Sequence, residues 1–202
     1  MRVVYTGGEG EITEKKSRFI ATVKPVQSEE EAVAFINETK KKYWDARHNC
    51  SAFVIGERQE LTRCSDDGEP AQTAGRPMLD VLLREKITDV AVVVTRYFGG
   101  VLLGTGGLVR AYTEAAKLAL ADAGIHQMQR MKLMDITCSY NDSGKVQYLL
   151  STNEISIENT EYGADVTFHT AVPVSDVSMI EKKITEATAA RAVIDEKGEK
   201  FV

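Results

Sequence analysis

The sequence contains little cysteine, little proline and no long apolar run. Its three cysteines are scattered and form no Cys-x-x-Cys pair, which excludes a disulfide framework and favours a reducing cytoplasm. No stretch has the length of a membrane span, and the first ten residues lack the apolar core of a signal peptide. We therefore expect a cytoplasmic protein that does not act at a membrane.

A large excess of charge of either sign is also missing. The chain has 25 Lys and Arg against 30 Asp and Glu, a net charge of −5. That balance excludes a globally basic nucleic-acid binder and leaves a local basic face open. With 202 residues, of which 43% are hydrophobic and 27% charged, the chain is long enough to bury a core without metals or disulfides, in one or two domains.

The first 125 residues alternate between strand-like and helix-like segments. Residues 16–26 have strand character. Ser28 and Glu31 form a capping box before an apolar helical face that reaches Tyr43. The later segments are expected in the order strand, strand, loop, helix, strand, glycine-rich loop and helix, over residues 50–55, 61–64, 65–77, 77–83, 90–94, 98–107 and 108–123. The β-branched run at 90–94 favours a strand covered on both faces.

A second pattern begins at Met131 and runs to the end of the chain. Its segments follow the order strand, helix, strand, strand, helix, strand, which is the ferredoxin-like arrangement. We expect a linker over residues 125–130 between the two parts. Residues 1–125 carry 17 basic and 18 acidic side chains, whereas the rest carries 8 and 12. The first part is therefore the better candidate for meeting an anion.

Two glycine-bearing loops in the first part are the strongest signs of a binding site. They span residues 65–77 and 95–110, and each runs from a strand into a helix. Such junctions present free backbone N–H groups and the positive end of a helix dipole. Arg76, Arg96 and Arg110 add guanidinium groups suited to phosphate oxygens. The alternative is that the glycines only permit turns and close packing. Neither the P-loop nor the dinucleotide-binding glycine pattern is present.

Catalytic and metal sites have weaker signals. The carboxylates of Asp66, Asp67 and Glu69 suit Mg²⁺, but Asp-Gly at this position equally forms a tight turn, which we favour. His48 and Cys50 form a candidate thiolate–imidazole pair, against which stands the ordinary packing of a buried cysteine. We expect no metal, no cofactor and no catalytic residue.

Several longer motifs occur in order along the first part. They are Asp-Ala-x-His-x-Cys at 45–50, Ser-Asp-Asp-Gly-Glu-Pro at 65–70, Thr-Ala-Gly-Arg-Pro at 73–77, Arg-Tyr-Phe-Gly-Gly at 96–100 and Leu-Gly-Thr-Gly-Gly-Leu-Val-Arg-Ala-Tyr at 103–112. Together they resemble the signature of the IMPACT family, in its bacterial branch. The flanking pattern of strands and helices fits the rest of the chain.

This resemblance implies an α+β protein of two domains. Residues 1–125 are expected to form a domain similar to the ribosomal protein S-five domain-two fold, which is related to domain four of elongation factor G. Residues 131–202 are expected to form a ferredoxin-like βαββαβ domain similar to the last domain of that factor. The family also suggests a translation-linked role. Its eukaryotic members repress activation of a starvation kinase that phosphorylates a translation initiation factor, using an extra N-terminal protein-binding domain, and we expect this chain to begin at the shared domain.

From the loops and the resemblance we expect a translation-associated regulator that binds RNA or the ribosome through the N-terminal domain. Arginines would hold phosphates while Tyr97 or Phe98 stacks on a base, and Trp44 is expected to pack onto the core instead. The candidate binding residues are Arg47, His48, Asp66, Asp67, Glu69, Arg76, Arg96, Tyr97, Gly99, Gly100, Gly104, Gly106, Gly107 and Arg110. Replacing Arg96 and Arg110 together with alanine is expected to abolish RNA binding and leave the fold intact.

Two other functions stay open from the sequence alone. One is an enzyme acting on a small phosphorylated or acyl substrate, through His48 with Cys50 or through the carboxylates of Asp66, Asp67 and Glu69. The other is a role in binding a protein partner, for which a translation-regulatory protein is the candidate.

Overall fold

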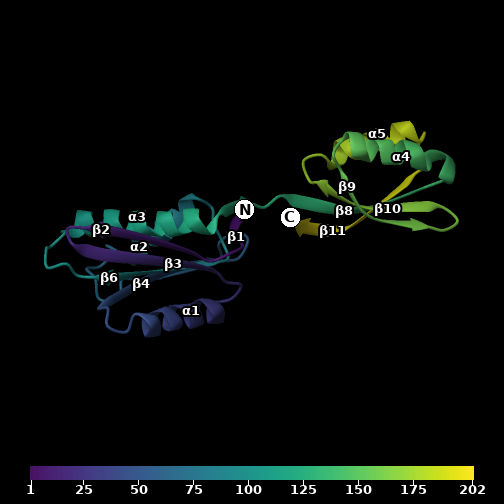
Figure 1. Ribbon diagram of the computed structural model, residues 1–202. Coiled ribbons are helices and arrows are strands. Elements are labelled where there is room, and N and C mark those ends of the chain that lie inside the picture. Colours follow the sequence, from purple (N-terminus) through teal and green to yellow (C-terminus); the bar gives the residue numbers. More distant parts are fainter. The chain divides into compact units, whose positions relative to one another are not determined.

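The computed structural model describes residues 1–202, which divide into an N-terminal unit, Met1–Gln127, and a C-terminal unit, Met128–Val202. Both units combine helices with a β-sheet (Figure 1). The expected α+β class with two domains is therefore confirmed. No helix combines the length and the apolar character needed to cross a membrane.

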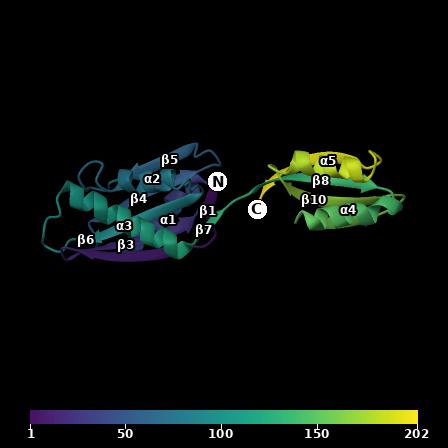
Figure 2. The ribbon, with the colours of Figure 1, turned by 90° about the horizontal axis from the view of Figure 1, so that it is seen from above.

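The N-terminal unit is built on a five-stranded antiparallel sheet. Its strands lie in the order β2 (Gly8–Glu14), β3 (Ser17–Pro25), β6 (Val90–Tyr97), β4 (His48–Ile55) and β5 (Leu61–Ser65). Helix α1 (Glu29–Lys42) covers one face, and α2 (Gly75–Arg84) and α3 (Thr105–Ala123) lie side by side on the other (Figures 1 and 2). The central strand β6 is buried from Val90 to Arg96, as expected for a β-branched run covered on both faces.

Two apolar layers hold this sheet between its helices. The larger one packs Phe19, Val92 and their neighbours against Met78 of α2 and Tyr112 of α3. The Phe19 and Tyr112 rings meet edge to face, with centroids 5.1 Å apart. The smaller layer packs α1 onto the opposite face through Phe35 and its neighbours. The sheet is therefore fixed on both sides, and loops at its ends are held by rigid elements.

Helix α1 begins where its sequence predicts. The Ser28 hydroxyl accepts the backbone N–H of Glu31 at 3.3 Å, and the Glu31 carboxylate accepts the backbone N–H of Gln27 at 2.7 Å. These two bonds satisfy amide groups that have no partner inside the helix. The predicted cap by Ser28 is confirmed, whereas the Glu31 carboxylate binds the amide one residue before the N-cap and not that of Ser28, as a capping box requires.

The loops that connect strand to helix are shorter than expected. Strand β6 continues to Tyr97, so Arg96 and Tyr97 lie on a strand. Helix α3 begins at Thr105, which places Gly106 and Gly107 in its first turn. Antiparallel pairing with β3 and β4 extends β6 past its apolar run. Helix α2 likewise begins at Gly75, two residues before the expected start.

The expected linker is partly a strand. Residues of β7 (Ile125–Gln127) pair antiparallel with β1 (Arg2–Val4), so Val3 lies opposite His126. This pairing joins the two ends of the N-terminal unit, and no local pattern in either three-residue segment indicates it. The boundary between the two units, after Gln127, lies inside the expected linker of residues 125–130, but Ile125–Gln127 form a strand of the N-terminal unit and Arg130 begins β8.

The C-terminal unit has the predicted order of elements. They are β8 (Arg130–Cys138), α4 (Tyr140–Thr152), β9 (Ser156–Tyr162), β10 (Val166–Pro173), α5 (Val177–Ala187) and β11 (Val193–Phe201). The strands form an antiparallel sheet in the order β11-β8-β10-β9, and α4 and α5 pack on one face around Ile136, Phe168 and Ile180. This is the ferredoxin-like arrangement that the sequence pattern predicts.

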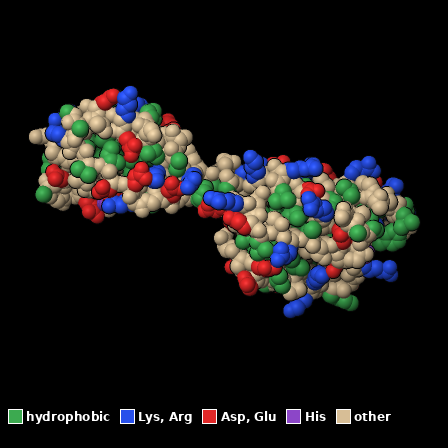
Figure 3. All heavy atoms as spheres, turned by 180° about the vertical axis from the view of Figure 1, so that it is seen from behind, with side chains coloured by type: hydrophobic (Ala, Val, Ile, Leu, Met, Phe, Trp, Pro, Cys, Tyr) green, Lys and Arg blue, Asp and Glu red, His purple; other side chains and the backbone are tan.

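Charged side chains of both signs are mixed on the surface. Figure 3 shows Lys and Arg interspersed with Asp and Glu over the face that it draws. Many of them pair across short distances, as Arg18 does with Glu11 at 2.6 Å and Arg76 with Asp80 at 2.8 Å. An electrostatic binding site must therefore be sought among cations without such partners.

Helix α3 packs so closely on β2 that its backbone leaves no room for a side chain at Gly8. A Cβ at this position would lie 2.3 Å from the carbonyl oxygen of Ala119 and 2.4 Å from the amide nitrogen of Ala123. Because both atoms belong to helical backbone, we expect Gly8→Ala to lower the free energy of unfolding by about 1–3 kcal/mol, measured by urea denaturation. Gly106→Ala is the control, because its Cβ meets nothing within 4 Å. An equal effect of the two substitutions would contradict this packing.

Candidate functional site

The loop between β5 and α2 is held by the carboxylate of Asp66. This carboxylate accepts the backbone N–H groups of Gln72 at 2.8 Å, Ala74 at 3.0 Å and Gly75 at 2.8 Å. Ala74, the residue before the first turn of α2, has no side chain that can accept them. Asp66 therefore caps α2 from across the loop, and its oxygens are used by the backbone.

Asp67 turns away from Asp66 and fixes the other end of the same loop. Its carboxylate accepts the backbone N–H of Asn49 at 2.7 Å and the ammonium group of Lys40 at 2.6 Å. Asp67 and Gly68 both have positive φ, 42° and 87°, which forms the tight turn that the sequence favoured over a magnesium site. No group of three potential ligands in the structure is arranged to hold a metal ion.

Glu69 forms a buried ion pair with Arg96. The two side chains are 3% and 7% exposed, and the Arg96 Nη1 lies 2.7 Å from the Glu69 Oε1. The Tyr112 hydroxyl donates to the same carboxylate oxygen at 2.8 Å. The Arg96 guanidinium lies over the rings of Phe19 and Phe98, at 5.4 and 5.5 Å from their centroids.

This placement corrects the expected role of Arg96. A guanidinium buried against a carboxylate and two aromatic rings cannot also contact a phosphate in solvent. Its replacement by alanine would leave Glu69 buried with no opposite charge, so we now expect such a variant to lose stability, where the sequence predicted an unaffected fold. Glu69 is likewise a structural partner and not a ligand group.

Cys50 lies in the same buried cluster. Two acceptors lie within reach of its single thiol proton, the backbone oxygen of Asp66 at 3.0 Å and the Tyr112 hydroxyl at 3.3 Å from Sγ. Burial, aided by the nearby Glu69 carboxylate, raises the pKa of the Cys50 thiol to about 12. The His48 ring is directed to the backbone oxygen of Asp67, 3.0 Å from Nδ1. The geometry therefore keeps the thiol protonated and assembles no thiolate–imidazole pair.

Most glycines of the family motifs allow close contacts or backbone conformations that a side chain would prevent. A Cβ at Gly99 would lie 2.0 Å from the carbonyl carbon of Lys16, and the Gly99 N–H donates to the Ser17 hydroxyl at 3.2 Å. Gly100 and Gly104 have φ values of 83° and 73°, which side-chain-bearing residues rarely adopt. The reading in which these glycines permit close approach and turns fits this geometry. Gly106 and Gly107 lie in the first turn of α3.

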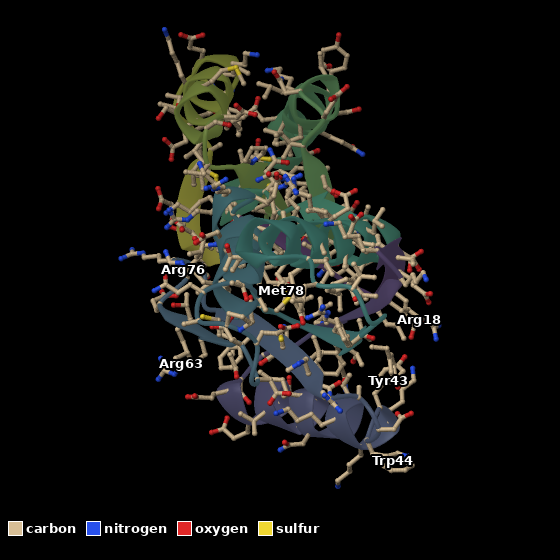
Figure 4. All side chains as sticks on the ribbon, turned by 90° about the vertical axis from the view of Figure 1, so that its left-hand side faces the viewer. Arg18, Tyr43, Trp44, Arg63, Arg76 and Met78 are labelled. Carbon is tan, nitrogen blue, oxygen red and sulfur yellow. The ribbon has the colours of Figure 1, made fainter.

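The four candidate arginines do not converge on one site. Arg76 lies on α2, where it pairs with Asp80 at 2.8 Å. Figure 4 shows it on the opposite side of the unit from Arg18, Tyr43 and Trp44. Arg96 is buried, whereas Arg47 and Arg110 are exposed. Only these last two are free to meet a ligand near the signature loops.

Arg47 and Arg110 lie at one end of the sheet, which we call the loop end. It consists of the β2–β3 turn (15–16), the α1–β4 loop (43–47) and the β6–α3 loop (98–104), together with the start of α3 as far as Arg110. The first residues of β3 and β4 pair with the last residues of β6, in the pairs Arg18–Tyr97 and His48–Arg96. Pairing across the sheet therefore brings three loops that are distant in sequence to the same end.

The loop end exposes residues that the sequence analysis did not select. Lys15 and Lys16 form the two-residue β2–β3 turn, both with positive φ, the geometry of a type I′ hairpin turn. Leu102 is 82% exposed, and Trp44 is 83% exposed. The expectation that Trp44 packs onto the core is therefore wrong, because the chain leaves α1 before the indole can reach the sheet. A Lys-Lys pair between two strands was the signal available for the turn.

A small cup opens between the α1–β4 loop and the end of β6. Its volume is about 220 Å³, and it is lined by Asp45, Arg47, Arg96, Tyr97 and Phe98. The Tyr97 hydroxyl donates to the Asp45 carboxylate at 2.7 Å, which raises the pKa of Tyr97. Tyr97 and Arg47 were candidates from the sequence, and Asp45 was not.

The buried ion pair between Arg96 and Glu69 is expected to contribute to the stability of the protein. We expect Arg96→Met to lower the free energy of unfolding by about 3–5 kcal/mol, because the Glu69 carboxylate loses its opposite charge inside the protein. Arg96→Met combined with Glu69→Gln is expected to cost less than the sum of the two single changes. Urea denaturation of the four proteins measures this coupling, and additive effects would count against the pair.

Thiol reactivity tests the state of Cys50. At neutral pH we expect a maleimide to label the exposed Cys64, and to label the buried Cys50 and Cys138 only in denaturant. The control is Cys64→Ser, which should show no labelling of the native protein. Rapid labelling of Cys50 in that variant, followed by mass spectrometry, would revive the enzyme hypothesis.

Comparison with known proteins also finds two domains, one in each of the two structural units. Residues 15–120 match the family model of the Impact N-terminal domain, and residues 136–191 match a domain of unknown function, DUF1949. The chain is similar along 96% of its length to a solved structure described as that of a hypothetical protein, with 32% identity, a TM-score of 0.59 and 95% of that chain covered.

Curated relatives give the same result. "IMPACT family member YvyE" of Bacillus subtilis is 40% identical over 96% of this chain and 89% of the relative. "IMPACT family member YigZ" of Escherichia coli is 36% identical over 85% of each. Mouse "Protein IMPACT" is 37% identical over 46% of this chain and 30% of its own length. The motifs, the two matched domains and these relatives show that the chain belongs to the IMPACT family.

Proposed function

We propose that this protein is a cytoplasmic, translation-associated regulator that binds RNA, free or within the ribosome, through the loop end of its N-terminal unit. The observation that carries the proposal is a group of exposed cations without carboxylate partners beside exposed aromatic rings. The translation-linked role is the one that the family resemblance implies.

The cations of the loop end suit phosphate groups. Lys15, Lys16, Arg47 and Arg110 are exposed and form no ion pair with an Asp or Glu. They project from three separate segments, so they can contact successive phosphates of one strand. The start of α3 lies beside them and has no side-chain cap, which leaves backbone amide groups available to an anion.

Aromatic side chains next to these cations suit unpaired bases. The Trp44 indole is 83% exposed and the Phe98 ring 50% exposed, on two neighbouring loops. Stacking on such rings is a common way to hold single-stranded nucleic acid and tolerates any base. The loop end therefore combines the two kinds of side chain that single-strand binding requires.

The net charge of −5 does not oppose this site. Most of the acidic excess belongs to the C-terminal unit, with 8 basic and 12 acidic residues after position 125. Because charges of both signs are mixed on the face in Figure 3, we expect a small footprint of a few phosphates. Its affinity would then fall moderately with salt.

The proposal is tested by replacing Lys16, Arg47 and Arg110 together with alanine. Co-sedimentation with ribosomes and titration of single-stranded RNA are expected to show a large loss of binding. The slope of log affinity against log salt should flatten by about 2, since each phosphate contact contributes about 0.7 for a single strand.

The matched control removes three cations from the opposite end of the sheet. Arg58, Arg84 and Lys86 are exposed and form no ion pair, and their replacement by alanine gives the same change in net charge. This variant should bind as the wild type does. Equal loss in both triple variants, or no binding by the wild type at low salt, would contradict the proposal.

A further inference from the structure

We propose that the cup at the loop end takes an unpaired guanine base. This inference rests on the proposed function, because it names what the RNA site recognises. The cup is lined by Asp45, Arg47, Arg96, Tyr97 and Phe98, and its volume of about 220 Å³ suits one nucleobase.

The cup holds two opposite charges that do not neutralise each other. Asp45 forms no ion pair, and its only side-chain partner is the Tyr97 hydroxyl, which donates to Oδ1 at 2.7 Å. Arg47 lines the same cup without pairing with Asp45. The second carboxylate oxygen and the guanidinium are therefore both available to a ligand that enters between them.

Guanine presents hydrogen-bonding groups that match this pair. Its N1–H and its amino group are adjacent donors, which the two oxygens of a carboxylate accept together. Oδ1 of Asp45 can accept one of them beside the Tyr97 hydroxyl, because each oxygen of an ionised carboxylate accepts more than one hydrogen bond. Its O6 and N7 are acceptors that an arginine contacts in a bidentate manner. Adenine, cytosine and uracil do not offer two adjacent donors on one edge. The hydrogen-bond acceptors of Asp45 and the donors of Arg47 together match guanine and none of the other three bases.

The rings of the cup supply stacking. Phe98 is half exposed, and the Arg96 guanidinium lies 5.5 Å from its ring centroid. Because Arg96 is itself fixed by Glu69 at 2.7 Å, the Phe98 ring has a rigid support. A base against Phe98 or Tyr97 gains stacking energy of the kind found in single-strand binding proteins.

A phosphate is a poor occupant of the same cup. The Asp45 carboxylate would repel it at close range, and the three other cations without partners, Lys15, Lys16 and Arg110, belong to other segments of the loop end. When a guanine occupies the cup, Arg47 is therefore expected to contact the base, while Lys15, Lys16 and Arg110 hold phosphates on the rim. A guanine ring can come from single-stranded RNA or from a free guanine nucleotide, and the experiment separates these two sources.

The experiment uses the full chain and the fluorescence of Trp44, the chain's one tryptophan, which precedes Asp45. Titrations compare a short oligouridine RNA with the same RNA carrying one central guanosine or one inosine, which lacks the amino group. We expect guanosine to tighten binding about five- to hundredfold over uridine, and inosine to lose part of that gain. A further titration uses guanosine monophosphate alone.

Asp45→Asn is the diagnostic variant, because an asparagine keeps an oxygen for Tyr97 but places a donor toward the guanine edge. It should lose the preference for guanosine and still bind oligouridine as the wild type does. Asp80→Asn is the matched control, since Asp80 lies on α2 beside Arg76, and it should keep the preference.

The outcomes separate the two proposals. Equal binding of the uridine and guanosine RNAs by the wild type would overturn the guanine cup and leave RNA binding intact. Binding of guanosine monophosphate that is lost in Asp45→Asn, together with no binding of either RNA, would support the cup with a free nucleotide as its source and overturn the proposed function. No binding of either ligand would overturn both.

Discussion

The ion pair between Arg96 and Glu69 connects the parts of the N-terminal unit on which the loop end is built. Arg96 comes from the end of the central strand, Glu69 from the β5–α2 loop, and Tyr112, which donates to the same carboxylate, from α3. A buried charge is costly without its partner, so these three elements hold their positions together. The exposed loops then start from a fixed base, which is what a binding surface made of loops needs.

The family motifs mainly describe this base. In Ser-Asp-Asp-Gly-Glu-Pro, Asp66 caps α2, Asp67 binds the start of β4 and Lys40, and Glu69 takes Arg96. Gly99 permits contact between the β6–α3 loop and the start of β3. The polar residues that look most reactive in the sequence thus form hydrogen bonds and ion pairs within the protein. The residues available to a ligand are less conspicuous side chains on the same loops.

Charged side chains in the N-terminal unit likewise fall into a group with internal partners and a group that is exposed to solvent. Carboxylates in the signature loops are satisfied by backbone amides and by Lys40 or Arg96, while Lys15, Lys16, Arg47 and Arg110 project into solvent without such partners. A protein with a net negative charge thereby keeps a local cationic surface.

The sequence by itself determined the order of elements. Local signals, such as the Ser28 cap and the β-branched run at 90–94, depend on neighbours a few residues away, and the βαββαβ order of residues 130–201 follows from them. Only the tertiary structure decided that Arg96 is buried, that Trp44 is exposed and that β7 pairs with β1. The partner of Arg96 is 27 residues away and that of Val3 lies at His126. The environment of a side chain is set by such distant contacts, which local patterns do not encode.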